Sequence, residues 1–127
     1  MQEPKFLICN HCGNVVYKVH DAGVPVMCCG EPMKELVPGS ADAAQEKHVP
    51  VVQVSQSHIT VEVGEAAHPM TEEHWIAWVF LQTLHGGQIA YLLPDQPPKA
   101  CFTVCHEDEP IAVFAYCNLH GLWKQAL

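Results

Sequence analysis

Short runs in which apolar and polar residues alternate dominate the chain from His48 onwards. The runs are rich in β-branched and aromatic residues and are separated by turn residues, a pattern typical of β-strands with one buried face. They cover residues 49–54, 58–63, 74–84, 88–93, 100–105 and 111–117. We expect His85, Gly86 and Gly87 to form a short hairpin loop between two long strands. These six strands, with no helical period among them, predict two packed antiparallel sheets and therefore an all-β sandwich.

The first 36 residues differ from the rest in composition, with four cysteines and three glycines. Residues 35–45 then pass through Pro38, Gly39 and Ser40 into an alanine-rich polar stretch, which is typical of a linker with room for one helical turn. A segment of a few dozen residues has too small a core to fold unaided, and the cysteines are candidates for the staple it needs. We therefore expect two domains, residues 1–36 and 37–127.

The overall composition, 49% hydrophobic and 16% charged, is that of an ordinary globular protein. Six lysines and no arginine stand against 14 acidic residues, and the resulting charge of -8 argues against nucleic acid as a partner. The longest apolar run, Ile76–Leu81, is far shorter than the ~18 residues of a membrane span, and Glu3 and Pro4 do not fit a signal peptide. The sequence indicates a cytoplasmic protein without a membrane segment. In that reducing compartment, seven cysteines and nine histidines favour metal binding over disulfides.

Four cysteines near the N-terminus form the first candidate metal site. Cys9 and Cys12 belong to a C-x-x-C-G knuckle, in which Gly13 permits a tight turn that can point backbone N–H groups at the sulfurs. Cys28 and Cys29 are adjacent, and adjacent ligands on one metal should distort its tetrahedron. Two disulfides or buried metal-free thiols are the alternatives, but a cytosolic segment of this size has too little core to fold unaided. Thiolates accept both zinc and iron, so the choice between a structural and a redox site stays open.

Four histidines and a distant cysteine form the second candidate site. Its members are His48, His68, His74, Cys117 and His120. They lie at the ends of predicted strands or in the connecting loops, which cluster at the ends of a sandwich and let distant ligands converge. Five protein donors are too many for closed tetrahedral zinc and suit iron, whose sixth position stays open for a small molecule. Lys47 adds positive charge beside such a site, which would attract a small anion.

The remaining histidines and cysteines have simpler explanations. We expect surface or loop positions for His11, His20, His58, His85 and His106. Cys101 and Cys105 lie on one face of a predicted strand with Thr103, and we interpret them as buried core thiols.

In their order, spacing and flanking residues, these motifs resemble desulfoferrodoxin, the two-iron class of superoxide reductase. The resemblance rests on the C-x-x-C knuckle, the adjacent cysteine pair, segments 42–50, 67–70 and 116–124, and His74. It covers essentially the whole chain. It implies a small desulforedoxin-like N-terminal domain with a rubredoxin-like iron, followed by a seven-stranded immunoglobulin-like β-sandwich that carries the catalytic iron.

The same resemblance implies roles for individual residues. The first iron would be held by Cys9, Cys12, Cys28 and Cys29. The second would have His48, His68, His74 and His120 as equatorial ligands and Cys117 as its axial ligand. Glu46 would occupy the sixth position in the ferric resting state, and Lys47 would attract superoxide and orient a water for protonation.

The implied reaction is the one-electron reduction of superoxide to hydrogen peroxide, in defence against oxidative stress. Family members are usually homodimers that are reduced again by rubredoxin or a similar small electron donor. Two other functions stay open on the residues alone. One is an electron-transfer protein whose two metals are closed to substrate, and the other is a zinc-stapled binding module.

Overall fold

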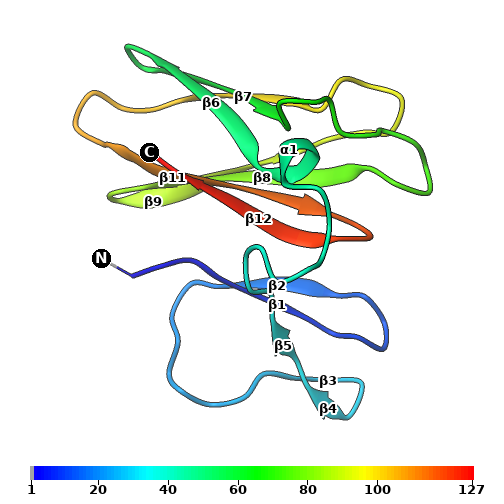
Figure 1. The fold of residues 1–127 in the computed structure, drawn as a ribbon. Helices are drawn as coiled ribbons and strands as arrows, with labels where there is room; N and C mark the ends of the chain where they lie inside the picture. The colour runs from blue at the N-terminus through cyan, green and yellow to red at the C-terminus, as the bar shows by residue number, and fades with distance from the viewer. Residues whose placement is uncertain (1) are drawn as a thin grey trace. The chain divides into compact units, whose positions relative to one another are not determined.

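Strands form almost all of the regular structure in the computed structural model, which describes residues 2–127 (Figure 1). The chain divides into two compact units, Met1–Val37 and Pro38–Leu127. The first contains β1 (Lys5–Ile8), β2 (Val15–Lys18), β3 (Met27–Cys28), β4 (Glu31–Pro32) and β5 (Lys34–Glu35). The second contains α1 (Gln45–His48), β6 (Pro50–Ser55), β7 (His58–Val63), β8 (Ile76–Thr83), β9 (Gly86–Tyr91), β10 (Lys99–Thr103), β11 (Pro110–Cys117) and β12 (Gly121–Ala126). The prediction of an all-β protein is confirmed.

In the first unit, β1 is the central strand of a three-stranded antiparallel sheet in the order β2-β1-β5, and β3 pairs with β4. Phe6 and Leu7 on β1 are buried. Asp21 holds the loop after β2, because it accepts hydrogen bonds from the ammonium groups of Lys18 at 2.6 Å and Lys5 at 2.8 Å. These two lysines keep the pKa of the Asp21 carboxyl well below its usual range. Polar contacts thus supplement a very small apolar core.

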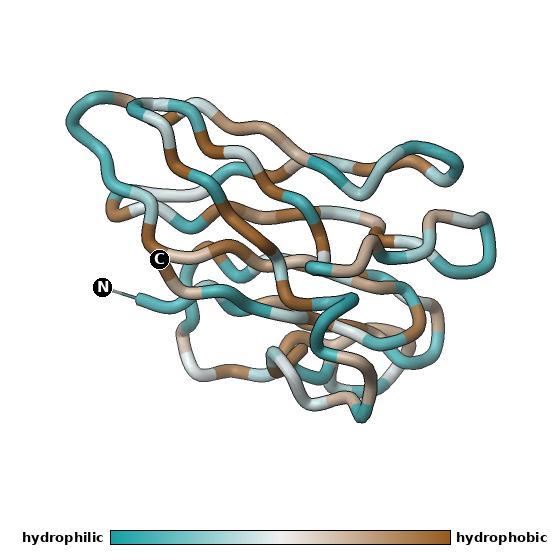
Figure 2. Tube along the Cα trace, turned by 45° about the horizontal axis from the view of Figure 1, so that its top comes forward, coloured by the Kyte–Doolittle hydropathy of each residue, from teal (hydrophilic) through white to brown (hydrophobic). Residues whose placement is uncertain are grey.

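The second unit is a sandwich of two antiparallel sheets, in the orders β10-β7-β6 and β12-β11-β8-β9. Its seven strands match the number that the family resemblance implies. Alternate residues of β7 and β10 face inward, and the tube in Figure 2 changes colour accordingly along the strands. The core between the sheets is made of Ile59, Val61, Val63, Ile76, Val79, Leu81, Ala100, Phe102, Val104, Val113, Ala115 and Cys117. One metal-ligand candidate, Cys117, is therefore part of the core itself.

The hairpin between β8 and β9 is tighter than predicted. Thr83 pairs with Gly86, so Leu84 and His85 form the turn, and both glycines belong to β9. The predicted loop of residues 85–87 is therefore wrong. A Cβ atom at Gly87 would lie 2.2 Å from the Cζ atom of Phe80. Close packing on an aromatic ring, rather than a turn, explains this glycine.

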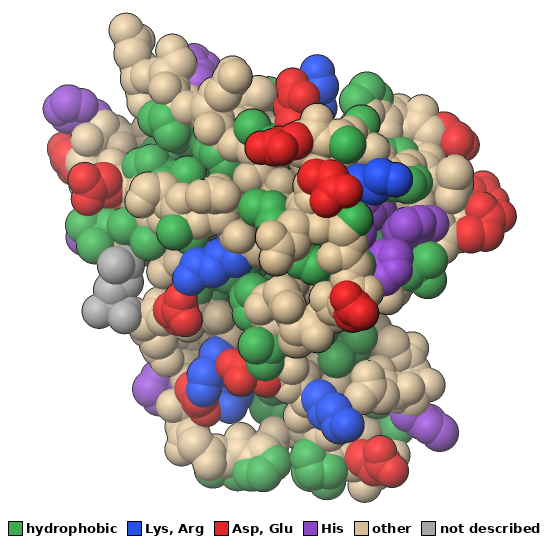
Figure 3. Space-filling view, in the orientation of Figure 1, with side chains coloured by type: hydrophobic (Ala, Val, Ile, Leu, Met, Phe, Trp, Pro, Cys, Tyr) green, Lys and Arg blue, Asp and Glu red, His purple; other side chains and the backbone are tan. Residues whose placement is uncertain are grey.

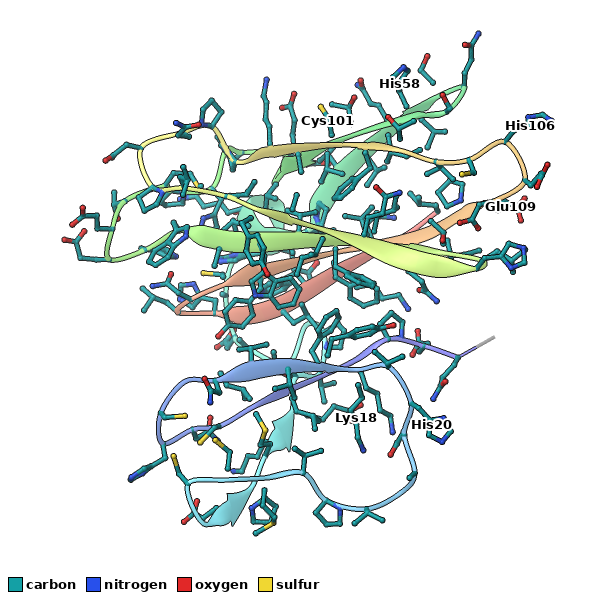
Figure 4. All side chains as sticks on the ribbon, turned by 180° about the vertical axis from the view of Figure 1, so that it is seen from behind. Lys18, His20, His58, Cys101, His106 and Glu109 are labelled. Atoms are coloured by element: carbon teal, nitrogen blue, oxygen red, sulfur yellow. The ribbon has the colours of Figure 1, made fainter. Side chains whose placement is uncertain are left out.

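Cys101 and Cys105 are exposed, so their interpretation as buried core thiols is wrong. Residues 100, 102 and 104 occupy the inward positions instead, because the alternation of β10 places Phe102 and its neighbours in the core. Cys101 lies on the outer surface of the β10-β7-β6 sheet, as does His58 (Figure 4). These thiols belong to the surface of the sandwich.

The helical turn expected in the linker begins only at Gln45, where the four-residue helix α1 carries the chain into β6. Within residues 2–127, no helix is long and apolar enough to cross a membrane.

Candidate metal centres

Two tight turns bring the four cysteines of the first unit together. The turn after β1 is closed by hydrogen bonds from the N–H of Gly13 to the carbonyl of Cys9 and from the N–H of Cys9 to the carbonyl of Asn14, both at 2.9 Å. Gly13 has a φ of 86°, which only glycine adopts without strain. In the second turn, between β3 and β4, Cys29 itself has a positive φ of 52°. This left-handed residue lets two adjacent cysteines share one cluster.

The four sulfurs fit a single tetrahedral metal ion. They all lie within 4.8 Å of one another, and the sulfurs of Cys12 and Cys28 are 3.6 Å apart. A metal–sulfur bond of about 2.3 Å gives a tetrahedral edge of about 3.8 Å, whereas a disulfide needs a sulfur separation of about 2.05 Å. The N–H of Cys12, 3.5 Å from the Cys9 sulfur, is the main cause that lowers the pKa of that thiol to about 6. Cys9 therefore favours the thiolate that a metal requires, whereas the neighbouring thiols raise the pKa values of Cys28 and Cys29 while no cation binds between them.

The second candidate site gathers residues from four segments at one end of the sandwich. His48 is the last residue of α1, His68 follows β7, His74 precedes β8, and Cys117 ends β11. His120 lies in the turn between β11 and β12. His48, His68 and Cys117 are buried, and His74 and His120 are partly exposed. Figure 3 shows a group of histidine side chains at the surface beside a basic side chain.

Backbone carbonyls orient two of the imidazoles. The Nδ1 of His48 lies 2.6 Å from the carbonyl oxygen of Ala44, and the Nδ1 of His68 lies 2.7 Å from that of Pro69. A carbonyl can only accept, so both Nδ1 atoms carry a proton and both neutral rings have an unprotonated Nε2. These two Nε2 atoms face each other at 3.2 Å. Two lone pairs at this distance repel each other unless a cation binds between them.

The four imidazoles form a closed ring of neighbours. Their centroids are separated by 4.6 Å (His48 and His68), 4.6 Å (His68 and His74), 5.1 Å (His74 and His120) and 5.0 Å (His120 and His48). Successive ring planes are nearly perpendicular, with angles from 74° to 90°. A metal–nitrogen bond of about 2.1 Å puts nitrogens at right angles about 3.0 Å apart. The observed contacts of 3.1 and 3.2 Å between the facing nitrogens fit such a square.

Cys117 adds a sulfur to this square. Its Sγ lies 3.8 Å from the Nδ1 of His120, and it accepts the N–H of His120 at 3.4 Å. Burial raises the pKa of the Cys117 thiol, whereas the N–H groups of Leu119 and His120 lower it. The side chain is fully buried. A thiolate there needs both these donors and a cation as its partners.

The electrostatics of the imidazoles favour neutral rings that can bind a metal. Burial is the main cause that lowers the pKa values of His48, His68 and His74, and the pKa of His68 falls to about 4. Within the described residues, the Nε2 of His74 is the buried side-chain nitrogen or oxygen that lacks a hydrogen-bond partner. An orphaned imidazole nitrogen aimed at other donors is what a metal site requires. The residues present therefore fit a metal ion.

Lys47 and Glu46 border this site on α1. Both side chains are exposed. Besides burial and the neighbouring imidazoles, the positive charge of Lys47 contributes to the lowered pKa values of His48 and His74, and Glu46 acts on His48 in the opposite sense. Glu46 also lines a surface hollow of about 690 Å³ together with Glu65 and residues 125–127. The structure thus brings Lys47 within electrostatic reach of two of the imidazoles.

The other expectations for histidine hold: His11, His20, His58, His85 and His106 are all exposed. Sequence reasoning missed the side chains that support the ligands. The indole of Trp123 stacks on His48 at 4.9 Å, and its Nε1–H donates to the carbonyl of His120 at 3.1 Å. Asn118, inside the C-x-x-H motif, binds the segment around His74. The position of Asn118 between Cys117 and His120 is the sequence signal that could have identified it.

Comparisons with known proteins agree with this arrangement. The family model described as Desulfoferrodoxin matches residues 40–126. A desulfoferrodoxin of Nitratidesulfovibrio vulgaris is 44% identical over 116 residues, which cover 91% of this chain and 90% of that protein. A superoxide reductase of Pyrococcus abyssi is 34% identical and covers 67% of this chain and 89% of its own length.

A solved structure of the superoxide reductase from Treponema pallidum has a TM-score of 0.82 and 38% identity, and it covers 98% of this chain and 99% of that one. The four thiols of the first unit, and His48, His74, His120 and Cys117 of the second, match the two iron centres that the resemblance implies. On the family match and the identities over nine-tenths of its length, the chain belongs to the desulfoferrodoxin family.

Proposed function

We propose that this protein is a superoxide reductase, which takes up one electron and two protons per superoxide and forms one hydrogen peroxide. The observation that carries the proposal is the square of four imidazoles with a buried thiol beside it. Five protein donors leave a six-coordinate metal one exchangeable position. Ferrous iron held by these residues would supply the electron and a position for a small anion.

We assign all five residues of the second site as ligands of that iron, including His68. The Nε2 of His68 lies 3.2 Å from that of His48, and its ring contacts His74. It thus occupies the fourth corner of the ring of imidazoles. The two carbonyls that hold the Nδ1 protons of His48 and His68 fix both rings before metal binding.

Lys47 and Glu46 are the catalytic residues of this proposal. The ammonium group of Lys47 acts electrostatically on His48 and His74, and in this proposal it attracts superoxide and can hold a water that donates a proton to the product. Glu46 lies one residue earlier on the same short helix and supplies a carboxylate that can bind the ferric resting state. The exposure of both side chains leaves the approach from solvent accessible.

The first unit is assigned as a desulforedoxin-like iron domain over residues 1–36, and residues 37–127 as the catalytic domain. We further propose a cytoplasmic homodimer that protects against superoxide and is reduced by rubredoxin or a similar small electron carrier. The family resemblance supports the partner and the dimer. The assignment of five of the seven cysteines as metal ligands supports a reducing compartment, where thiols stay unoxidised.

The test is to mix anaerobically reduced protein with a known amount of superoxide and to measure both hydrogen peroxide and dioxygen. One peroxide per superoxide without dioxygen supports the reductase. Equal amounts of peroxide and dioxygen indicate a dismutase, and no product above background indicates an electron-transfer protein. Either of the latter two results contradicts the proposal.

A further inference from the structure

The segment that carries His74 is joined to the segment that carries Cys117 by one side chain, that of Asn118. Its Oδ1 accepts the N–H of Trp75 at 2.9 Å, and its Nδ2 donates to the carbonyl of Glu73 at 2.9 Å. Its backbone N–H donates to the carbonyl of Trp75 at 3.2 Å. Three hydrogen bonds therefore run from one residue to the two peptide neighbours of His74.

These bonds begin where the sheet ends. The ladder between β11 and β8 closes at the pair Cys117 and Ile76, after an irregularity in register between Tyr116 and Cys117. Beyond that point the side-chain amide of Asn118 acts like a peptide group, with one donor and one acceptor. Together with the backbone bond from the N–H of Asn118 to the carbonyl of Trp75, it continues the pairing around His74 beyond the last pair of the ladder.

The position of the His74 imidazole is set by main-chain contacts to a greater extent than the positions of the His48 and His68 imidazoles. Carbonyl oxygens hold the Nδ1 atoms of those two rings, at 2.6 and 2.7 Å. For His74, the fixed points lie in the main chain, where a tight turn links it to Thr71 and Asn118 clamps the residues before and after it. A small movement of this segment would therefore move the His74 imidazole relative to the Cys117 sulfur.

We propose that Asn118 is a positioning residue of the second iron centre: its amide clamps both neighbours of His74 and so sets that imidazole against Cys117. Asn118 acts through His74 and makes no bond to the metal. The inference rests on the iron centre assigned above and does not depend on the reaction with superoxide. Outer partners of metal ligands typically change metal affinity by about 10–100-fold when they are replaced.

The experiment compares full-length, iron-loaded wild-type protein with N118A, N118D and two controls. N118D keeps the shape and the acceptor for Trp75 but places a carboxylate against the Glu73 carbonyl. Q125A changes an exposed side chain on β12, away from the ligands. G87A presses a methyl group onto Phe80, at the end of β8 that lies away from His74. It therefore shows what a loss of stability alone does to the iron centre.

The readouts are the ferrous dissociation constant, by chelator competition, and the thiolate-to-iron absorption band of the oxidised centre. The absorption of the four-cysteine centre is the internal reference. We expect N118A to raise the dissociation constant by about 10–100-fold and to shift the band, N118D to act in the same direction, and both controls to leave the band unchanged.

An unshifted band with wild-type iron affinity in N118A overturns the proposal, even if the melting temperature falls. If N118A does not fold, an unshifted band in N118D overturns it equally. Since no superoxide is added, failure of this inference and failure of the reductase assignment are separate results.

Discussion

Replacing Gly64 by alanine tests how tightly the Lys47 segment is held against the sandwich. Gly64 follows β7, has a φ of 87° and donates its N–H to the carbonyl of Val49 at 3.3 Å. A Cβ atom there would lie 2.4 Å from the carbonyl oxygen of Ala66 and 2.6 Å from that of Lys47. Both obstacles are backbone atoms, so no side-chain rotation relieves the contact. The nearer oxygen would have to retreat by about 0.6 Å to reach the 3.0 Å limit of real Cβ contacts.

Two costs add in G64A. A side chain in the left-handed region costs about 1–2 kcal/mol, and overpacking costs about 1–3 kcal/mol. A loss of at least about 2 kcal/mol in the free energy of unfolding lowers the melting temperature of a unit of this size by at least about 8 °C. Since Lys47 directly precedes His48 and Ala66 lies two residues before His68, we expect the proposed iron centre to retain its metal less well.

Thermal unfolding of the iron-loaded protein, with two matched glycine variants, separates the two costs. Gly39 has a φ of 71° with nothing within 4 Å of a Cβ, so G39A carries only the backbone cost. Gly86 has neither a left-handed φ nor an atom within 4 Å of a Cβ. We expect the free energy of unfolding of G86A to lie within about 0.5 kcal/mol of that of the wild type. If G64A melts no lower than G39A, the steric argument at Gly64 is refuted.

Three further predictions follow from the described contacts. Replacing Lys47 by alanine should slow superoxide capture and flatten its dependence on ionic strength while iron content is unchanged, and stopped-flow rates across a salt series check this. G87A should lower the melting temperature by pressing a methyl group onto Phe80, and a wild-type melting curve would contradict the packing described. In the iron-loaded protein, Cys101 and Cys105 should be the thiols that a mild alkylating reagent modifies first, as mapped by peptide mass spectrometry.

The candidate metal ligands could be predicted from sequence because their local motifs are themselves structural. A C-x-x-C-G turn and a C-x-x-H turn keep two donors close whatever the rest of the fold does. The long-range part of the second site followed from one topological fact, that loops of a sandwich meet at its ends. The positions of His48, His68 and His74 at such ends were therefore sufficient to expect a cluster.

The supporting contacts could not be predicted, because they join segments that no local pattern relates. Asn118 binds residues 43 and 45 positions away. β12 lacks the alternation of a strand because both Leu122 and Trp123 are buried. The alternation along β10 is compatible with either Cys101 or Phe102 facing the core. Phe102 faces inward because it has the larger apolar volume, and Cys101 is therefore exposed.

A chain with a net charge of -8 repels anions on average. A site that captures an anion therefore needs positive charge close by. At physiological ionic strength the screening length is about 8 Å, so carboxylates elsewhere on the surface contribute little at the second site. Lys47 lies close enough to act on two of its imidazoles, and these are held neutral by burial. The charge that an approaching anion meets is therefore set by Lys47, Glu46 and the bound cation rather than by the net charge. In dilute buffer, where screening extends further, the distant carboxylates should oppose capture and leave Lys47 as the main source of attraction from the chain.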